Sequence, residues 1–246
     1  MIHVKNKPLH TDGVRSFLFR NLNEQATMLA LLASTLAYSA AGVPATPQQW
    51  TSRSATYSNN GIMPGCVGGE TLSFLYDFDN RRQKQIWTSG SHAGYTDVMR
   101  YDKKVPGEIW SRGYHWKPGQ EAGCCYFDLC TSQPCSASTA QMMEKIEVPS
   151  GATDEGPSGA HGEHWFKDMS IKFLNITNIN DWIVDTSNGM AISNWTSKAS
   201  LPKVGSCHST KLYGEVTLGN LTEDDFAYPR LCDNMCGESV MKSLRF

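Results

Sequence analysis

The chain has 246 residues, of which 40% are hydrophobic, and its formal net charge is −2. The 22 basic and 24 acidic residues are well mixed, so charge gives no case for binding nucleic acid or an anionic membrane surface. All eight cysteines follow residue 65. This even number predicts a disulfide framework if the chain is secreted, whereas metal or redox chemistry competes if it is cytosolic.

Residues 1–41 have the pattern of a signal peptide. Four basic side chains precede an apolar run from Met28 to Gly42, which is shorter than the roughly 20 residues that a membrane-spanning helix needs. Small residues at Ser39 and Ala41 suit cleavage after Ala41. The alternatives are translation from Met28, because the basic region is long, and a buried or amphipathic N-terminal helix. We therefore expect a secreted, extracellular protein.

The rest of the chain is divided by composition. Residues 42–69 are rich in Ser, Thr, Pro, Gly and Asn, which predicts an extended lead-in that Cys66 fastens to the domain. Residues 70–236 alternate between β-type runs and turn residues, which predicts one all-β domain, and residues 237–246 form a C-terminal tail. The predicted strands lie at residues 71–78, 84–88, 95–102, 108–116, 123–129, 142–148 and 211–218.

The stretch from His164 to Trp195 carries the strongest local signal. Asn188-Gly189 lies between two runs rich in aromatic and β-branched residues, which predicts a β-hairpin, and the stretch supplies three strands in all. A Gly- and Pro-rich segment, residues 149–162, precedes it and predicts a surface loop. Residues 138–144 fit a short helix as well as a strand.

Three sequons, at Asn175, Asn194 and Asn220, fit the N-glycosylation pattern. They agree with the signal peptide and with the even number of cysteines. We therefore expect at least one of them to carry a glycan when the host is eukaryotic.

The dense cluster Cys124-Cys125-Tyr-Phe-Asp-Leu-Cys130 resembles the motif of secreted phospholipase A2. Phe127 stands where that motif has its general-base histidine, so the cluster is better explained as a disulfide-stapled strand and loop. Adjacent residues of a strand point to opposite faces, so Cys124 and Cys125 should have different partners. The pairing otherwise stays open within the set Cys66, Cys124, Cys125, Cys130, Cys135, Cys207, Cys232 and Cys236.

A zinc site can be drawn from His161 and His164 with Cys232 and Cys236, and it would support a secreted metal-dependent hydrolase. Disulfides are the better explanation of these cysteines in an oxidising compartment, so we predict no metal site. The sequence has no Gly-x-Ser-x-Gly nucleophile elbow. Paired acids such as Asp224-Asp225 lie in turn-like segments, where they could bind calcium weakly, and no other cofactor is expected.

A series of short landmarks follows in a fixed order along the latter half of the chain: Tyr101-Asp102, Trp110, Cys125-Tyr126-Phe127, His164-Trp165, Trp182 and the closing run from Phe226 to Cys232. In this order the chain resembles the ependymin-related proteins, whose fold is similar to the bacterial lipoprotein carriers LolA and LolB, over roughly residues 70 to 232. The resemblance implies two stacked antiparallel sheets curved into a disulfide-stapled half-barrel with a hydrophobic pocket. It also implies secretion, N-glycosylation, a homodimer, calcium-dependent behaviour, matrix contact and no enzymatic activity.

These observations predict a secreted glycoprotein that binds a hydrophobic small molecule, such as a lipid or fatty acid. An extracellular matrix or adhesion component with weak calcium binding is the first alternative, and the metal-dependent hydrolase is the second. The candidate ligand-binding residues are large apolar side chains on predicted strands: Trp110, Trp116, Tyr126, Phe173 and Trp182.

Overall fold

The computed structural model describes residues 42–63, 66–131, 134–237 and 240. The predicted signal peptide, residues 1–41, therefore lies outside the described residues, and so does most of the predicted tail. Within the described ranges, no helix is long and apolar enough to cross a membrane.

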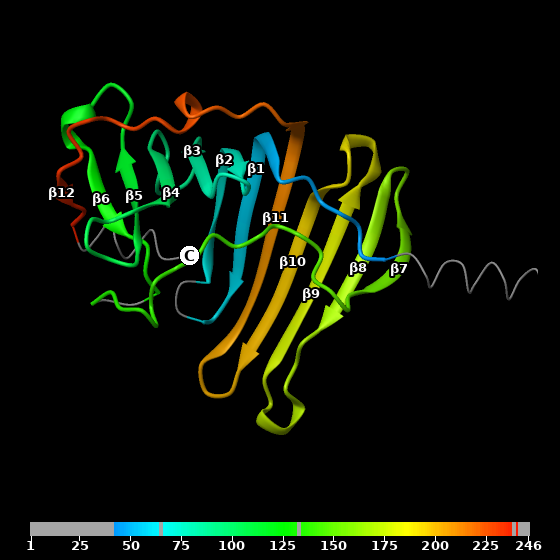
Figure 1. The fold of residues 1–246 in the computed structure, drawn as a ribbon. Helices are drawn as coiled ribbons and strands as arrows, with labels where there is room; N and C mark the ends of the chain where they lie inside the picture. Colours follow the sequence, from blue (N-terminus) through cyan, green and yellow to red (C-terminus); the bar gives the residue numbers. More distant parts are fainter. Residues whose placement is uncertain (1–41, 64–65, 132–133, 238–239, 241–246) are drawn as a thin grey trace, which may run out of the picture. The chain divides into compact units, whose positions relative to one another are not determined.

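Twelve strands form a single sheet in this part of the chain, in the order β12-β6-β5-β4-β3-β2-β1-β11-β10-β9-β8-β7 (Figure 1). Neighbouring strands pair antiparallel, except that β12 runs parallel to β6. Short 3-10 helices η1 to η4 lie between strands. The bounds are β1 (Gln49–Gly61), β2 (Val67–Asp77), β3 (Arg82–Trp87), β4 (Thr96–Lys104), β5 (Ser111–Trp116), η1 (Glu121–Gly123), β6 (Cys125–Asp128), β7 (Thr153–Ser158), β8 (Gly162–Asp168), η2 (Lys172–Leu174), β9 (Thr177–Asp185), η3 (Thr186–Asn188), β10 (Ala191–Leu201), β11 (Gly205–Leu218), η4 (Asp224–Phe226) and β12 (Asn234–Met235).

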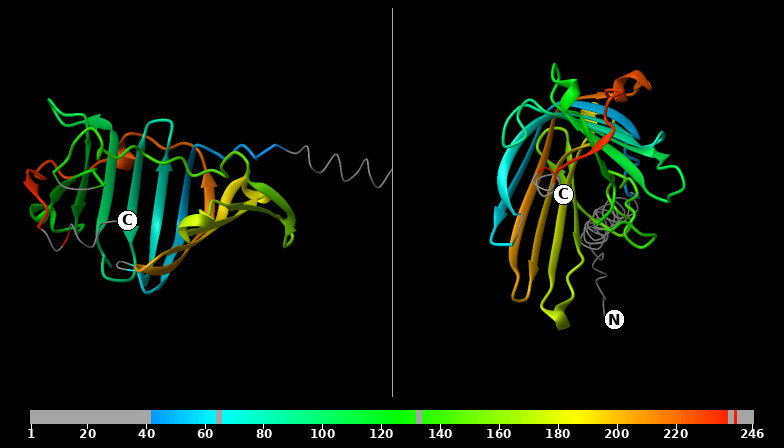
Figure 2. Two further views of the ribbon diagram at one scale, coloured as in Figure 1. Left: turned by 90° about the horizontal axis from the view of Figure 1, so that it is seen from below. Right: turned by 90° about the vertical axis from the view of Figure 1, so that its left-hand side faces the viewer.

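The all-β, disulfide-stapled fold is confirmed, and the sheet is strongly curved (Figure 2). It is one continuous sheet, where two stacked sheets were expected. The predicted hairpin is also confirmed, since β9 and β10 pair around η3 and Gly189, whose φ of 74° places it in the left-handed region.

Residues 42–69 do not form a lead-in outside the domain. They contain β1, which lies in the sheet between β2 and β11. Trp50, Ser52 and Ala55 of β1 are buried, whereas Arg53 and Ser54 between them are exposed. The polar composition of this segment therefore belongs to a strand that exposes polar side chains and buries Trp50.

Two other segments also differ from the prediction. Residues 142–148 are irregular and belong to no strand, and residues 138–144 are not helical. The predicted surface loop contains β7, which pairs only with β8 at the edge of the sheet. An edge strand tolerates Pro157 because one side of its backbone needs no partner.

The C-terminal segment, residues 219–236, runs from β11 back to β12 (Figure 1). Phe226 is fully buried in one cluster with Val98 and Trp116, whose side chains project from the face that we call the outer face of β4 and β5. The ring of Tyr228 stacks on that of Tyr114, with 3.6 Å between centroids. The segment therefore covers one side of the outer face.

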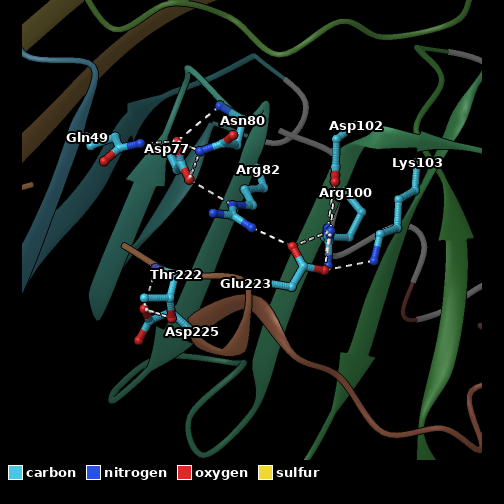
Figure 3. Close-up of polar contacts among 10 residues, drawn as sticks. All are labelled: Gln49, Asp77, Asn80, Arg82, Arg100, Asp102, Lys103, Thr222, Glu223 and Asp225. Carbon is cyan, nitrogen blue, oxygen red and sulfur yellow. Dashed lines mark hydrogen bonds and ion pairs between the residues drawn. The ribbon is translucent and has the colours of Figure 1, made fainter. Parts of the chain in front are cut away.

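Ion pairs fasten this segment to the sheet (Figure 3). The register sets Arg82 of β3 directly opposite Arg100 of β4, and like charges in this position repel each other. Glu223 accepts hydrogen bonds from Arg82 Nη1 at 2.5 Å and from Arg100 Nη2 at 2.8 Å. Further contacts complete the network, in which Asp77 binds Arg82, Asp102 binds Arg100, and Lys103 binds Glu223.

Four disulfides join the described residues. Cys124 pairs with Cys232 and Cys125 with Cys236, which confirms that the adjacent cysteines have different partners. Both bonds tie the C-terminal segment to β6 and the residue before it. The other two bonds are Cys66–Cys207, from the start of β2 to β11, and Cys130–Cys135, which closes a short loop. Such a framework is typical of an extracellular or periplasmic protein.

Candidate functional site

A row of aromatic side chains crosses the face of the sheet opposite the outer face, which we call the inner face. On β8, β9, β10, β11 and β1 the register pairs Trp165 with Trp182, Trp182 with Trp195, Trp195 with Lys211, and Lys211 with Tyr57. Directly paired residues project from the same face of a sheet. Four aromatic side chains and one lysine therefore lie side by side, and we call them the aromatic row.

A compact aromatic cluster adjoins this row on β1, β2 and β11. The ring centroid of Trp50 lies 5.4 Å from that of Phe74, 5.3 Å from Tyr76 and 5.0 Å from Tyr213. Burial raises the pKa of Tyr213 to about 12 and also raises the pKa values of Tyr57 and Tyr76. These hydroxyls therefore stay neutral. The aromatic row and this cluster together form an apolar surface with a few hydrogen-bonding groups, which we call the aromatic floor.

An irregular segment, residues 142–148, lies across the inner face (Figure 1), and we call it the strap. Met143 belongs to the core cluster around Trp50, and Val148 belongs to the cluster around Trp182. Ile146 packs against both clusters. The strap therefore covers the aromatic floor with three apolar side chains.

The strap has few polar attachments. No backbone–backbone hydrogen bond joins residues 142–148 to the rest of the described chain. The Tyr76 hydroxyl accepts a hydrogen bond from the Ile146 amide at 2.7 Å, and the Thr46 hydroxyl donates to the Ile146 carbonyl at 3.1 Å. Segments held mainly by side-chain contacts open at a lower free-energy cost than hydrogen-bonded strands.

Lys211 is the one cation of the aromatic row. Its Nζ atom lies 4.6 Å from the ring centroid of Trp195 and 5.2 Å from that of Tyr57. It forms no ion pair or hydrogen bond with any described residue. Burial lowers the pKa of Lys211, and the negative charge of Glu144 in the strap partly opposes this effect.

Two acid–histidine pairs lie near the same face, toward β2, β3, β4 and β5. His115 Nδ1 lies 2.6 Å from Asp97 Oδ1, and the Trp87 indole donates to Asp97 Oδ2 at 2.5 Å. His92 Nδ1 lies 3.1 Å from Glu70 Oε1. Among the described residues, no group of three or more His, Cys, Asp or Glu side chains is arranged to hold a metal ion. We assign these pairs to the satisfaction of buried polar groups.

Two hollows accompany these features. One has a volume of about 70 Å³ and lies beside the start of the strap, lined by Phe78, Tyr101 and Met143 among others. The second, of about 430 Å³, is open and polar, and its lining includes Arg82 and Glu223. Neither is an apolar chamber of acyl-chain size, because the first is too small and the second is polar.

The five predicted ligand-binding residues do not lie together. Trp116 is buried on the outer face with Phe226, and Trp182 is buried on the inner face beside Val148. Tyr126 of β6 lies under the guanidinium of Arg112. Two others lie outside the strands: Trp110 just before β5, half-buried, and Phe173 in η2, 87% exposed.

The inner face is built largely from residues that sequence reasoning did not select. Trp50 and Tyr57 lie in the segment interpreted as a lead-in, and Tyr76 and Lys211 were placed on strands without a role. The alternation of Lys211 and Tyr213 was the available signal, because both side chains must share a face of β11. Their aromatic neighbours become apparent only from the register with β1 and β10.

The alternative sites can be placed as well. Cys232 and Cys236 are both in disulfides, which removes the Cys2His2 zinc site. His164 Nε2 instead lies 3.0 Å from Asp181 Oδ1. Of the paired acids, Asp225 accepts hydrogen bonds from the amide and hydroxyl of Thr222.

The three sequons differ in their surroundings. Asn175 ends η2 and Asn220 follows β11, both exposed and with φ of 53° and 62°. Asn194 lies inside β10, half-buried, and pairs with Ile183 and Leu212 on its two sides. We propose that glycosylation is confined to the first two, because a sequon within the sheet is less accessible.

Site-resolved mass spectrometry of glycopeptides from protein secreted by eukaryotic cells checks this expectation. We expect high occupancy at Asn175 and Asn220 and low occupancy at Asn194. An Asn194 glycan at high occupancy would contradict it, and Asn175→Gln should remove one glycan mass without changing the others.

Comparisons with known proteins add little to this geometry. No family model matches the sequence, so the ependymin-related resemblance stays a prediction, and no curated protein matches it. An uncharacterized conserved protein from Thermus thermophilus has a similar structure, with a TM-score of 0.44 at 9% identity, over 76% of this chain and 90% of that one. A LolA superfamily protein from Nitrosomonas europaea has a TM-score of 0.36 at 9% identity, over 75% and 92%. Similarities this distant say nothing about a ligand of this chain.

Proposed function

We propose that the protein is secreted and binds a hydrophobic molecule, such as a fatty acid or another lipid, on the inner face of its sheet. The ligand takes the place that the strap fills in this structure. The observation that carries the proposal is the contrast between the aromatic floor and the strap that covers it. The aromatic floor is built on paired strands, whereas its cover is an irregular segment that forms no backbone–backbone hydrogen bond with the rest of the described chain.

The free energy of binding comes from apolar burial, at about 25 cal/mol per Å² of area removed from water. The ligand must displace Met143, Ile146 and Val148, so the cost of opening the strap subtracts from its intrinsic affinity. Methionine is suited to such a segment because its flexible side chain packs against varied surfaces. The strap thus protects the floor from water when no ligand is present.

A second candidate is an extracellular matrix or adhesion component, either monomeric or a homodimer. It is supported by the small volume of the hollow beside the strap, about 70 Å³. In that case the strap would be a permanent part of the core, and the surface and glycans would make the contacts.

Titration with a fluorescent fatty acid distinguishes the two, and Tyr76→Phe sharpens the test. Saturable binding is expected for the native chain. The variant loses the hydroxyl that holds the Ile146 amide, which weakens the strap by about 1 kcal/mol. Apparent affinity should therefore rise about fivefold.

Tyr126→Phe is the matched control, because the Tyr126 hydroxyl has no hydrogen-bond partner among the described residues and lies away from the strap. Its affinity should equal that of the native chain. Absence of saturable binding in all three proteins would favour the adhesion component. Binding that is unchanged in Tyr76→Phe would show that the ligand does not compete with the strap.

A further inference from the structure

Lys211 lies at a boundary on the inner face. The aromatic rings of Tyr57 and Trp195 flank it on the two neighbouring strands. A row of polar residues lies on the same face, two positions further along each strand. The register pairs these polar residues across four strands, and directly paired residues share a face. The polar row consists of Asn59, Ser209, Ser197 and Asn180.

The charge of Lys211 is unpaired within the described chain. Two aromatic faces contact it, and cation–π contacts of this kind retain a positive charge without neutralising it. Because the side chain is half-buried, an anion that reached it would interact through a lower dielectric than at the surface. Glu144 of the strap acts on Lys211 through its charge but forms no ion pair with it, so this half-buried cation favours an external partner of opposite sign.

We propose that Lys211 makes the inner face selective for amphiphiles that carry a single apolar chain and an anionic head group, either a carboxylate or a phosphate. The inference rests on the proposed function and names its ligand class. The apolar chain replaces the strap over the aromatic floor, and the head group lies at Lys211, where the face changes from aromatic to polar.

The strap itself has the chemistry of such a ligand. Met143 places an apolar side chain in the cluster around Trp50, and the next residue, Glu144, is the acid whose charge acts on Lys211. The proposed ligand has the same order of groups as Met143-Glu144, an apolar part followed by an anionic one. The ligand therefore competes with Met143 for the floor and with Glu144 for the cation.

Competition binding against a fluorescent fatty acid tests the inference with two probe pairs. Dodecanoate is compared with dodecanol, and a lysophosphatidate with the monoacylglycerol of the same chain, so that carboxylate and phosphate are distinguished. In Lys211→Met we expect affinity for at least one anionic probe to fall about tenfold, a loss typical of one charged contact. Affinity for the neutral probes should stay within a factor of two.

Three variants make the result specific. Lys198→Met removes an exposed lysine from the opposite face of β10 and should change nothing. Lys211→Arg keeps the charge and should keep the selectivity, which guards against a fold defect in Lys211→Met. Glu144→Gln removes the competing carboxylate and should tighten the anionic probes a few-fold and leave the neutral ones unchanged.

The outcomes separate the two proposals. If no probe binds the native chain, the proposed function fails and this inference fails with it. If anionic and neutral probes bind equally well, or if Lys211→Met weakens both kinds alike, the inference is overturned and the proposed function stands. A tenfold loss restricted to the anionic probes supports both.

Discussion

Removing both disulfides that hold the C-terminal segment should lower the free energy of unfolding by about 5 kcal/mol, whereas removing either one alone should cost at most about 2 kcal/mol. Cys124–Cys232 and Cys125–Cys236 span 108 and 111 residues. Each therefore closes a long loop when the other is absent. When one is present, however, the second closes a loop of only a few residues, and little chain entropy remains to be lost.

Urea denaturation of three variants measures this coupling. In two of them one cysteine pair is replaced by alanine, and in the third both pairs are replaced. The control is removal of Cys130–Cys135, whose sequence separation is 5, and its loss should be about 2 kcal/mol or less. Losses that simply add across the two long-range bonds would contradict the shared-loop explanation.

The second large effect is expected for Glu223→Gln, which should lower the free energy of unfolding by about 1–2 kcal/mol. The side chains of Arg82 and Arg100 are only 7% and 2% exposed, and they face each other across β3 and β4. Breaking a fully buried pair costs about 3–5 kcal/mol, but the Glu223 side chain is 57% exposed, so solvent screens part of the loss. Each arginine also keeps its own aspartate.

The same substitution should change the acid stability. Hydrogen bonds from Lys103 and Arg100 lower the pKa of Glu223 to about 2, from an ordinary value near 4.5. A depressed carboxyl pKa contributes stability that is present above pH 4.5 and is lost as the pH falls toward 2. The native chain should therefore lose its advantage over Glu223→Gln across that window.

Melting temperatures of both proteins from neutral pH down to about pH 2 check the effect. Asp224→Asn is the control, because Asp224 is the neighbouring exposed acid in η4 and forms no ion pair with a described residue. A constant difference between native protein and Glu223→Gln at all pH values would show that the carboxylate charge is not what fastens the segment.

Local patterns in the sequence were sufficient for part of this fold. Asn188-Gly189 indicated the β9–β10 hairpin because the turn depends only on adjacent residues. Cys124 and Cys125 were expected to have different partners because adjacent strand residues point to opposite faces, and their bonds confirm it.

Long-range packing decided the rest. β1 resembles a linker in sequence because most of its residues are polar, and only its position between β2 and β11 makes it a core strand. Residues 142–148 have the composition of a strand, yet they pair with no strand of the described chain and cover the sheet instead. The importance of Lys211 depends on its register with Tyr57 and Trp195, which no local pattern contains.

The most direct measurement is native mass spectrometry of the protein secreted from a eukaryotic host, before and after organic extraction. If the inner face binds a lipid, we expect an added mass in the range of a single-chain lipid, lost on extraction and regained on incubation with a fatty acid. The Tyr76→Phe variant should retain that mass through mild extraction steps that already remove it from the native chain. A clean protein mass that never regains a ligand, in native chain and variant alike, would contradict binding at the inner face.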